Sequence, residues 1–258
     1  MPATQQNELA IIVYAPALAS NDSRPLAVVR EMERALPGLR LEWMVSKEGA
    51  PVPLPQRDAW ISQGRADGPG FPLVCNGGDE NDLITVYGLE IPAGRSPGGK
   101  PLFDVHATLP LNAGNIAAAM DVLEGIAEGA HAFWGHATPY SAGVDIARQT
   151  KNWAANPQPP PRGLPALKLS WTLPSPVIPH RLGWLNYWSA AACQAIGFPN
   201  PVRDADLLSR SRRTATGGWL IQLTPIPLDL DNPAHLDALL RAYERFPEIG
   251  GRMQNAIP

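Results

Sequence analysis

The sequence is poor in charge and in cysteine, and it lacks long hydrophobic runs. Asp, Glu, Lys and Arg make up 17% of its 258 residues, less than the usual quarter of a soluble domain. Cys75 and Cys193 are far apart and outside any CxxC pair, which excludes a disulfide framework and predicts buried, reduced thiols. No apolar run approaches the roughly 20 residues that cross a bilayer, and residues 1–10 lack the basic segment of a signal peptide. We therefore expect a cytoplasmic protein without membrane contacts.

The usual patterns of catalytic and ligand-binding sites are missing as well. Gly94–Pro101 has the spacing of a phosphate loop, but Pro101 stands where that loop needs a hydroxyl, so a hairpin loop is the better interpretation. His131 and His136 do not have the i, i+3 or i, i+4 spacing of a helical metal pair. No GxSxG elbow occurs. We therefore expect no catalytic residue, no cofactor and no metal, and an enzyme is the less favoured class.

Charge is distributed unequally along the chain. Residues 1–149 contain 10 Lys and Arg against 17 Asp and Glu, a net charge of −7. Residues 150–258 contain 11 against 7, a net charge of +4. This asymmetry predicts two parts with different surfaces. Because no dense basic stripe occurs, the sequence argues against direct binding of nucleic acid.

Alternation and β-branched runs predict strands, whereas apolar residues at helical spacing predict helices. In the first part, strands are expected at residues 9–18, 39–46, 71–76, 83–89 and 102–109, a proline-rich loop at 49–57, and helices at 25–36, 58–65, 112–134 and 144–149. In the second part, helices at 190–196 and 234–246 are expected on either side of a hairpin at 212–224. Gly197 should end the first of these helices, and Asn232-Pro233 should begin the second.

Clustered strands and few helices indicate an α+β fold. We expect a mixed or antiparallel sheet with helices packed on one face. Prolines crowd residues 153–180, which predicts an extended, semi-rigid strap. This strap would join two fused subdomains, an acidic α+β subdomain at 1–152 and a smaller α+β subdomain at 181–258.

Two groups of acidic residues are the candidate partner-binding sites. Three acids crowd the turn at 77–82, and three more line one face of the predicted helix at 112–134. Charged runs are most often solvated surface, so both groups are also compatible with a structural role. The candidates are Asp79, Glu80 and Asp82 in the turn and Asp121, Glu124 and Glu128 on the helix.

Two short segments resemble known proteins. Residues 132–139 (AFWGHATP) and 181–187 (RLGWLNY) resemble immunity proteins of bacterial polymorphic toxin systems, especially those paired with restriction-endonuclease-like toxins. In such families a helix ending in Trp-Gly precedes an LGW-x-x-Tyr segment. The whole chain resembles an uncharacterised family of myxobacterial proteins more closely, through segments 161–168 and 213–219.

The resemblance to immunity proteins implies a protein that binds a cognate toxin and occludes it without catalysis. A nuclease-like toxin presents basic residues to phosphate, and the acidic first part could complement that surface. The competing hypothesis is a small-molecule enzyme with a cleft between the two subdomains. His106, His136, Asp145 and Arg181 would then line the cleft. A structural or regulatory α+β module without either activity is the third alternative.

Overall fold

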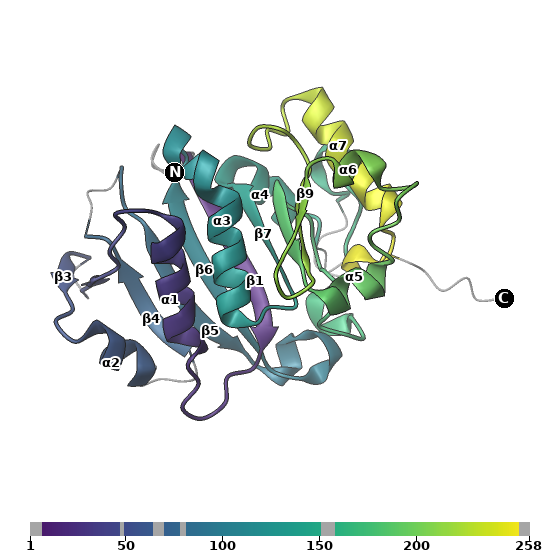
Figure 1. The fold of residues 1–258 in the computed structure, drawn as a ribbon. Coiled ribbons are helices and arrows are strands. Elements are labelled where there is room, and N and C mark those ends of the chain that lie inside the picture. Colours follow the sequence, from purple (N-terminus) through teal and green to yellow (C-terminus); the bar gives the residue numbers. More distant parts are fainter. Residues whose placement is uncertain (1–6, 47–48, 64–69, 78–80, 151–157, 253–258) are drawn as a thin grey trace.

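The computed structural model describes residues 7–46, 49–63, 70–77, 81–150 and 158–252 (Figure 1). Its first part contains β1 (Glu8–Pro16), α1 (Arg24–Ala35), β2 (Trp43–Val45), β3 (Pro51–Pro53), α2 (Arg57–Gln63), β4 (Gly70–Cys75), β5 (Thr85–Ile91), β6 (Leu102–Pro110), α3 (Ala113–Ala130), β7 (Trp134–Pro139) and α4 (Tyr140–Ala147). The second part contains β8 (Leu185–Trp188), α5 (Ala190–Ile196), α6 (Ala205–Leu208), β9 (Ser211–Arg213), β10 (Trp219–Gln222) and α7 (Pro233–Arg245).

All ten of these strands belong to one sheet, in the order β3-β2-β4-β5-β6-β1-β7-β8-β10-β9. Every strand pair is antiparallel, and the expected α+β class is confirmed. The pairing of β7 with β8 carries the sheet from the first part of the chain into the second. The two parts therefore share a sheet and one contiguous hydrophobic core.

Helices cover both faces of the sheet, so the expectation that they pack on one face is wrong. Successive residues of a strand point to opposite faces. In β8, the Tyr187 hydroxyl donates a hydrogen bond to Glu128 of α3 at 3.0 Å. The next residue, Trp188, packs edge-on against Phe246 at the end of α7, with ring centroids 5.2 Å apart. Because all four residues of β8 are buried, this strand needs a helical layer on each side.

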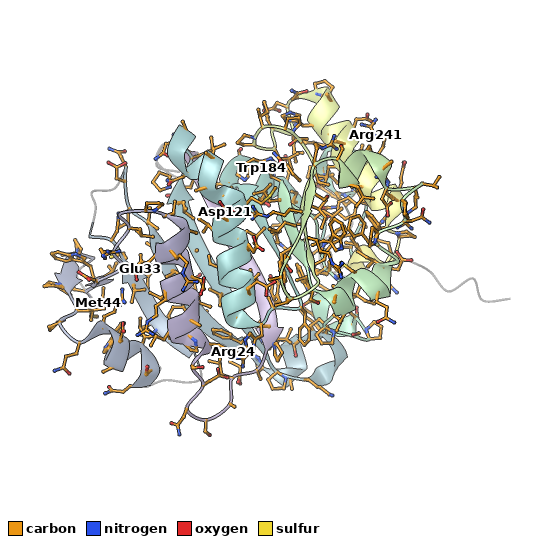
Figure 2. All side chains as sticks on the ribbon, viewed as in Figure 1. Arg24, Glu33, Met44, Asp121, Trp184 and Arg241 are labelled. Atoms are coloured by element: carbon orange, nitrogen blue, oxygen red, sulfur yellow. The ribbon has the colours of Figure 1, made fainter. Side chains whose placement is uncertain are left out.

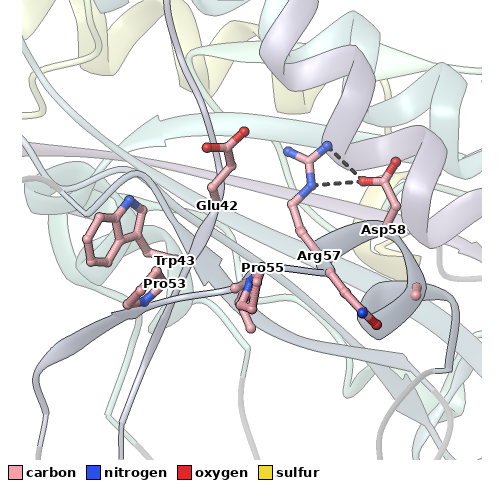
Figure 3. A pocket seen from close by; sticks show the side chains of 9 residues that line it. Glu42, Trp43, Pro53, Pro55, Arg57 and Asp58 are labelled. Atoms are coloured by element: carbon pink, nitrogen blue, oxygen red, sulfur yellow. Dashed lines mark hydrogen bonds and ion pairs between the residues drawn. The ribbon is translucent and has the colours of Figure 1, made fainter.

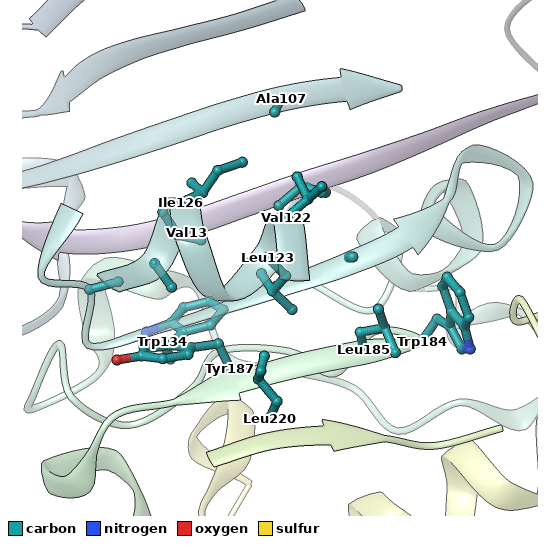
Figure 4. Close-up of a cluster of buried hydrophobic side chains, with 14 of the residues drawn as sticks. Val13, Ala107, Val122, Leu123, Ile126, Trp134, Trp184, Leu185, Tyr187 and Leu220 are labelled. Atoms are coloured by element: carbon teal, nitrogen blue, oxygen red, sulfur yellow. The ribbon is translucent and has the colours of Figure 1, made fainter. Parts of the chain in front are cut away.

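The core beneath α3 is built from both parts of the chain (Figure 4). The side chains of Leu123 and Ile126 of α3 point toward the sheet, where Val13 of β1 faces them. Leu220 of β10 belongs to the same buried cluster. These buried apolar contacts hold the two parts together, because burial removes hydrocarbon surface from water.

The long helix is shorter than the sequence predicts. It ends at Ala130, and His131 adopts the left-handed conformation with φ 54°, which closes the helix. Trp134 and Gly135 therefore begin β7 and do not end the helix, contrary to the expectation at 112–134. Gly135 lies opposite Val13, where an added Cβ would come within 2.5 Å of Val13 Cγ1. Only glycine allows this close strand contact.

Other elements follow the sequence with changes in extent. The strand expected at 39–46 is limited to β2, and the loop expected at 49–57 contains the short strand β3. The strand β8 was not predicted, because its residues do not alternate between polar and apolar. Gly197 ends α5 with φ 64°, and the Asn232 side chain accepts a hydrogen bond from Ala234 N at 3.0 Å, as expected for these helix ends.

The described portion of the proline-rich segment, residues 158–180, lies against the first part of the chain. The Trp134 indole donates to the Pro176 carbonyl at 3.1 Å, and Gly98 N donates to the Leu173 carbonyl at 2.8 Å. Leu167 N donates to the Gln149 carbonyl at 2.9 Å. These hydrogen bonds tie the segment to the side of the sheet opposite α3.

We expect Trp188→Ala to lower the free energy of unfolding by about 3–5 kcal/mol, because it removes a fully buried ring and leaves a cavity. Trp171→Ala is the matched control, since this tryptophan is 50% exposed, and its effect should stay within about 0.5 kcal/mol. Urea denaturation monitored by circular dichroism measures both. Equal effects of the two variants would contradict the described packing.

Candidate functional site

The acidic face of α3 contacts the second part of the chain. Arg212 of β9 forms ion pairs with Asp121, at 2.7 Å, and with Glu124. Glu128 accepts hydrogen bonds from the Thr216 hydroxyl at 2.7 Å and from Tyr187. Figure 2 shows Asp121 on the side of α3 that faces the strands of the second part. The predicted helical spacing does place the three acids on one face, but each has a partner within the chain.

This face retains an excess of negative charge. One guanidinium, that of Arg212, faces three carboxylates. The Asp121 side chain is 56% exposed, so it remains available to solvent while it is paired. Burial and the nearby charge of Glu128 raise the pKa of the Tyr187 phenol, which keeps its hydroxyl protonated as a donor. The acidic face of α3 is therefore both an internal contact and an outward negative surface.

The second predicted acidic group lies only partly within the described residues. Asp79 and Glu80 fall outside them. Asp82 is exposed, and its carbonyl accepts a hydrogen bond from Asn76 Nδ2 at 3.0 Å. The structure thus places Asp82 in a closed turn beside the end of β4.

An open hollow of about 520 Å³ lies beside β2, β3 and α2 (Figure 3). Arg57 forms ion pairs in it with Asp58, at 2.9 Å, and with Glu33 of α1. Sequence reasoning missed this hollow, because its residues come together only when the β2–β3 pair and α2 pack. The lining residues are Glu42, Trp43, Pro53, Leu54, Pro55, Gln56, Arg57, Asp58 and Ala59.

The sheet face opposite α3 brings together most of the residues expected to line an enzymatic cleft. His106 and His136 both lie opposite Ile12, on the strands that flank β1. Burial, and after it the charge of nearby Arg181, lowers the pKa of His136. Asp145 is engaged elsewhere, in ion pairs with Arg162 at 2.6 Å and with Arg148 at 3.3 Å. Three of the four residues thus share a neighbourhood.

Several polar atoms on this face are buried without a hydrogen-bond partner among the described residues. They include Asp104 Oδ1, His136 Nε2, Arg181 Nε and the Trp188 indole nitrogen. The other carboxylate oxygen of Asp104 lies 2.9 Å from His106 Nε2. Burial, reinforced by the charge of Arg181, lowers the pKa of His136 to about 3, so its ring is neutral near pH 7. A neutral histidine can accept or donate a hydrogen bond but cannot supply a positive charge.

The described residues contain no reactive cysteine and no cluster of metal-ligating side chains. Both cysteines are buried, as expected, and burial raises the pKa of the Cys193 thiol to about 12. No group of three or more His, Cys, Asp or Glu side chains suited to hold a metal is found in the described ranges. In the same ranges, no helix is both long and apolar enough to cross a bilayer.

The fold defines the class of this protein as α+β, with a ten-stranded antiparallel sheet between helical layers. The chain belongs to the family described as a domain of unknown function, DUF5953, whose model matches residues 20–254. No curated protein matches its sequence.

A solved structure with a similar fold is the Pseudomonas aeruginosa T6SS protein PA0821. The TM-score is 0.51 at 16% sequence identity, and the match covers 92% of this chain and 76% of that chain. At this level of identity the similarity establishes a shared fold.

We expect the protein to lose stability as the pH falls from about 6.5 toward 3. The unfolded chain protonates His136 in this window while the folded chain does not, so acid favours unfolding. His180, whose pKa burial lowers to about 4, acts in the same direction. In His136→Asn, the free energy of unfolding should depend less steeply on pH. His131→Asn, at an exposed position, should keep the slope of the unaltered protein. Equal slopes in all three proteins would refute the assignment.

Arg212→Ala should lower the free energy of unfolding by about 1 kcal/mol or less, because the pairs it removes are partly exposed. The loss should shrink in high salt, which screens such pairs. Arg213→Ala is the control, since the neighbouring residue of β9 points to the other face. Thermal denaturation at low and high salt measures both variants, and a salt-independent loss would contradict an electrostatic contact.

Proposed function

We propose that this chain is an immunity protein that binds a cognate bacterial toxin, basic and nuclease-like, and occludes it without catalysis. The observation that carries the proposal is the fold shared with a T6SS protein over 92% of this chain. That likeness supports a role connected with a secretion system. The resemblance of residues 132–139 and 181–187 to immunity proteins of toxin systems points in the same direction.

The two segments that resemble immunity proteins are neighbours in the fold. Gly135 pairs with Tyr187, and His136 pairs with Asn186, where β7 joins β8. All residues of β7 and β8 are buried. The resemblance therefore concerns the centre of the sheet, and the toxin-binding residues must be sought on the surface.

The acidic face of α3 is the surface that this proposal assigns to the toxin. Its three carboxylates are offset by one guanidinium, and the first part of the chain has a net charge of −7. A nuclease needs basic groups to hold phosphate, and a complementary acidic surface steers association and covers those groups. Asp82, and in the proposal Asp79 and Glu80, would form a second, separate contact.

A second candidate function, binding of a small polar molecule for catalysis, is favoured by the buried unpartnered atoms opposite α3. Asp104 Oδ1 is an acceptor, Arg181 Nε is a donor, and neutral His136 can act as either. Buried polar groups are rarely left unsatisfied, so water or a ligand with both donors and acceptors would suit them.

The test starts from the gene beside the one for this chain, which the proposal expects to encode a toxin domain. Co-expression should restore growth, and the purified proteins should form a complex measurable by calorimetry. The double variant Asp121→Lys/Glu124→Lys should weaken binding by about 100-fold or more, as expected when an acidic surface becomes repulsive.

The matched control is Asp237→Lys/Glu244→Lys, which makes the same charge change on α7. It should bind like the unaltered chain. Urea denaturation of both variants excludes unfolding as the cause. Full neutralisation by the α3 variant would refute the acidic contact, and failure of the unaltered chain to bind would refute the proposed function for this toxin.

A further inference from the structure

We propose that the hollow beside β2, β3 and α2 receives an arginine or lysine side chain of the protein partner, through the Trp43 ring and the Glu42 carboxylate that both line it. This inference rests on the proposed function and names a contact within it. The occupant is a basic side chain carried by a protein segment, and three features of the hollow argue for it.

The first feature is the position of the Trp43 ring. Trp43 pairs with Pro53 across β2 and β3, so both side chains lie on one face of the sheet. On this face the ring is packed over Gly77, where an added Cβ would come within 2.7 Å of its atoms. The side chain nevertheless remains half-buried and lines the hollow (Figure 3). It is therefore a supported aromatic surface open to a ligand, the kind that binds cations and anchors protein interfaces.

The second feature is the charge of the lining. The guanidiniums of Arg57 and Arg30 are paired with the carboxylates of Glu33 and Asp58, so these four charges offset one another. Glu42 is exposed and has no ion pair or side-chain hydrogen bond with any described residue. The lining of the hollow therefore has one negative charge left over, and a cation complements it.

The third feature is the edge of the sheet. An exposed edge strand commonly accepts a strand from a partner, but β3 contains Pro51 and Pro53, which have no N–H to donate. A partner must therefore engage this edge through side chains. The volume of about 520 Å³ is that of a ligand site and suits a side chain together with its flanking backbone.

The hollow and the acidic face of α3 belong to the same helical layer. Asp58 at the start of α2 forms an ion pair with Arg30 of α1. α1 in turn packs against α3, where Gly129 of α3 leaves room for the backbone of Ala27 of α1 (Figure 1). A partner that covers this layer would meet both negative surfaces. Two separated contacts on one rigid layer would add affinity and orient the partner.

The first measurement is affinity for the toxin domain used above. Glu42→Gln should weaken binding by about 3- to 10-fold and Trp43→Ala by about 10- to 100-fold, the range of rim charges and aromatic anchors. Trp43→Leu keeps an apolar side chain and removes the aromatic face, so it should also weaken binding. Asp237→Asn and Trp171→Ala are matched controls outside the hollow. If the unaltered chain binds and the hollow variants bind equally well, the inference fails while the proposed function stands.

The second measurement does not need the toxin. It uses nuclear magnetic resonance of protein labelled at the tryptophan indoles. The Trp43 signal is assigned as the one that Trp43→Leu removes. The protein is titrated with acetylarginine amide and, separately, with acetylcitrulline amide, its uncharged isostere. The arginine compound should shift the Trp43 signal at millimolar concentration, the citrulline compound should shift it at least several-fold less, and Glu42→Gln should reduce the difference. Equal shifts, or none, overturn the inference even where the toxin domain does not bind.

Discussion

The pairing of β7 with β8 is the contact on which the rest of the structure depends. It joins a first part with a net charge of −7 to a second part with a net charge of +4 and makes their strands one sheet. Because β7 and β8 are buried on both faces, each face needs its own helical layer. α3 covers one face, and α7, with the proline-rich segment, covers the other. The close approach of β7 to β1 at Gly135 makes this central arrangement possible.

Acidic side chains serve two purposes on the layer of α1, α2 and α3. Arg212 draws Asp121 and Glu124 into an internal contact, and Arg57 does the same with Glu33 and Asp58. At Arg212 the carboxylates outnumber the guanidinium that meets them, whereas the pairs of Arg57 and Arg30 offset one another and leave only the Glu42 carboxylate over. At Arg212 a partner competes with partly exposed internal pairs of small net stability, so a negative surface can hold the fold together and still attract a basic protein.

The opposite sheet face differs in chemistry. His136 and Asp104 are buried among strands, with polar atoms that no described residue satisfies. Burial keeps His136 neutral near pH 7. The cost of burying such groups appears as acid sensitivity, because between about pH 6.5 and 3 the unfolded chain protonates this histidine and the folded chain does not. One face of the sheet is therefore covered by an exposed, charged helical layer, whereas the other face contains buried polar groups.

Local patterns in the sequence were sufficient to predict most of the helices and strands. Residue spacing predicts the buried strand β1 and the strands β5 and β6. Gly197 and Asn232 mark helix ends, because the backbone freedom of glycine and the side chain of asparagine act on neighbouring residues. The three acids of α3 were correctly placed on one face for the same reason. The left-handed backbone at His131 was not foreseen, because only a small fraction of histidines adopt it, and so Trp134 was assigned to the wrong element.

Contacts between distant segments needed the tertiary structure. β8 is buried on both sides, and only the presence of α3 and α7 explains why it is a strand. The hollow at Trp43 exists because β3 and α2 fold back beside β2, and the partners of Asp121 and Glu124 come from residue 212, nearly a hundred positions later. Spacing along the chain determines which side chains share a face of one element. Which faces meet is decided by packing across the whole sheet, where burial of apolar surface outweighs local preference.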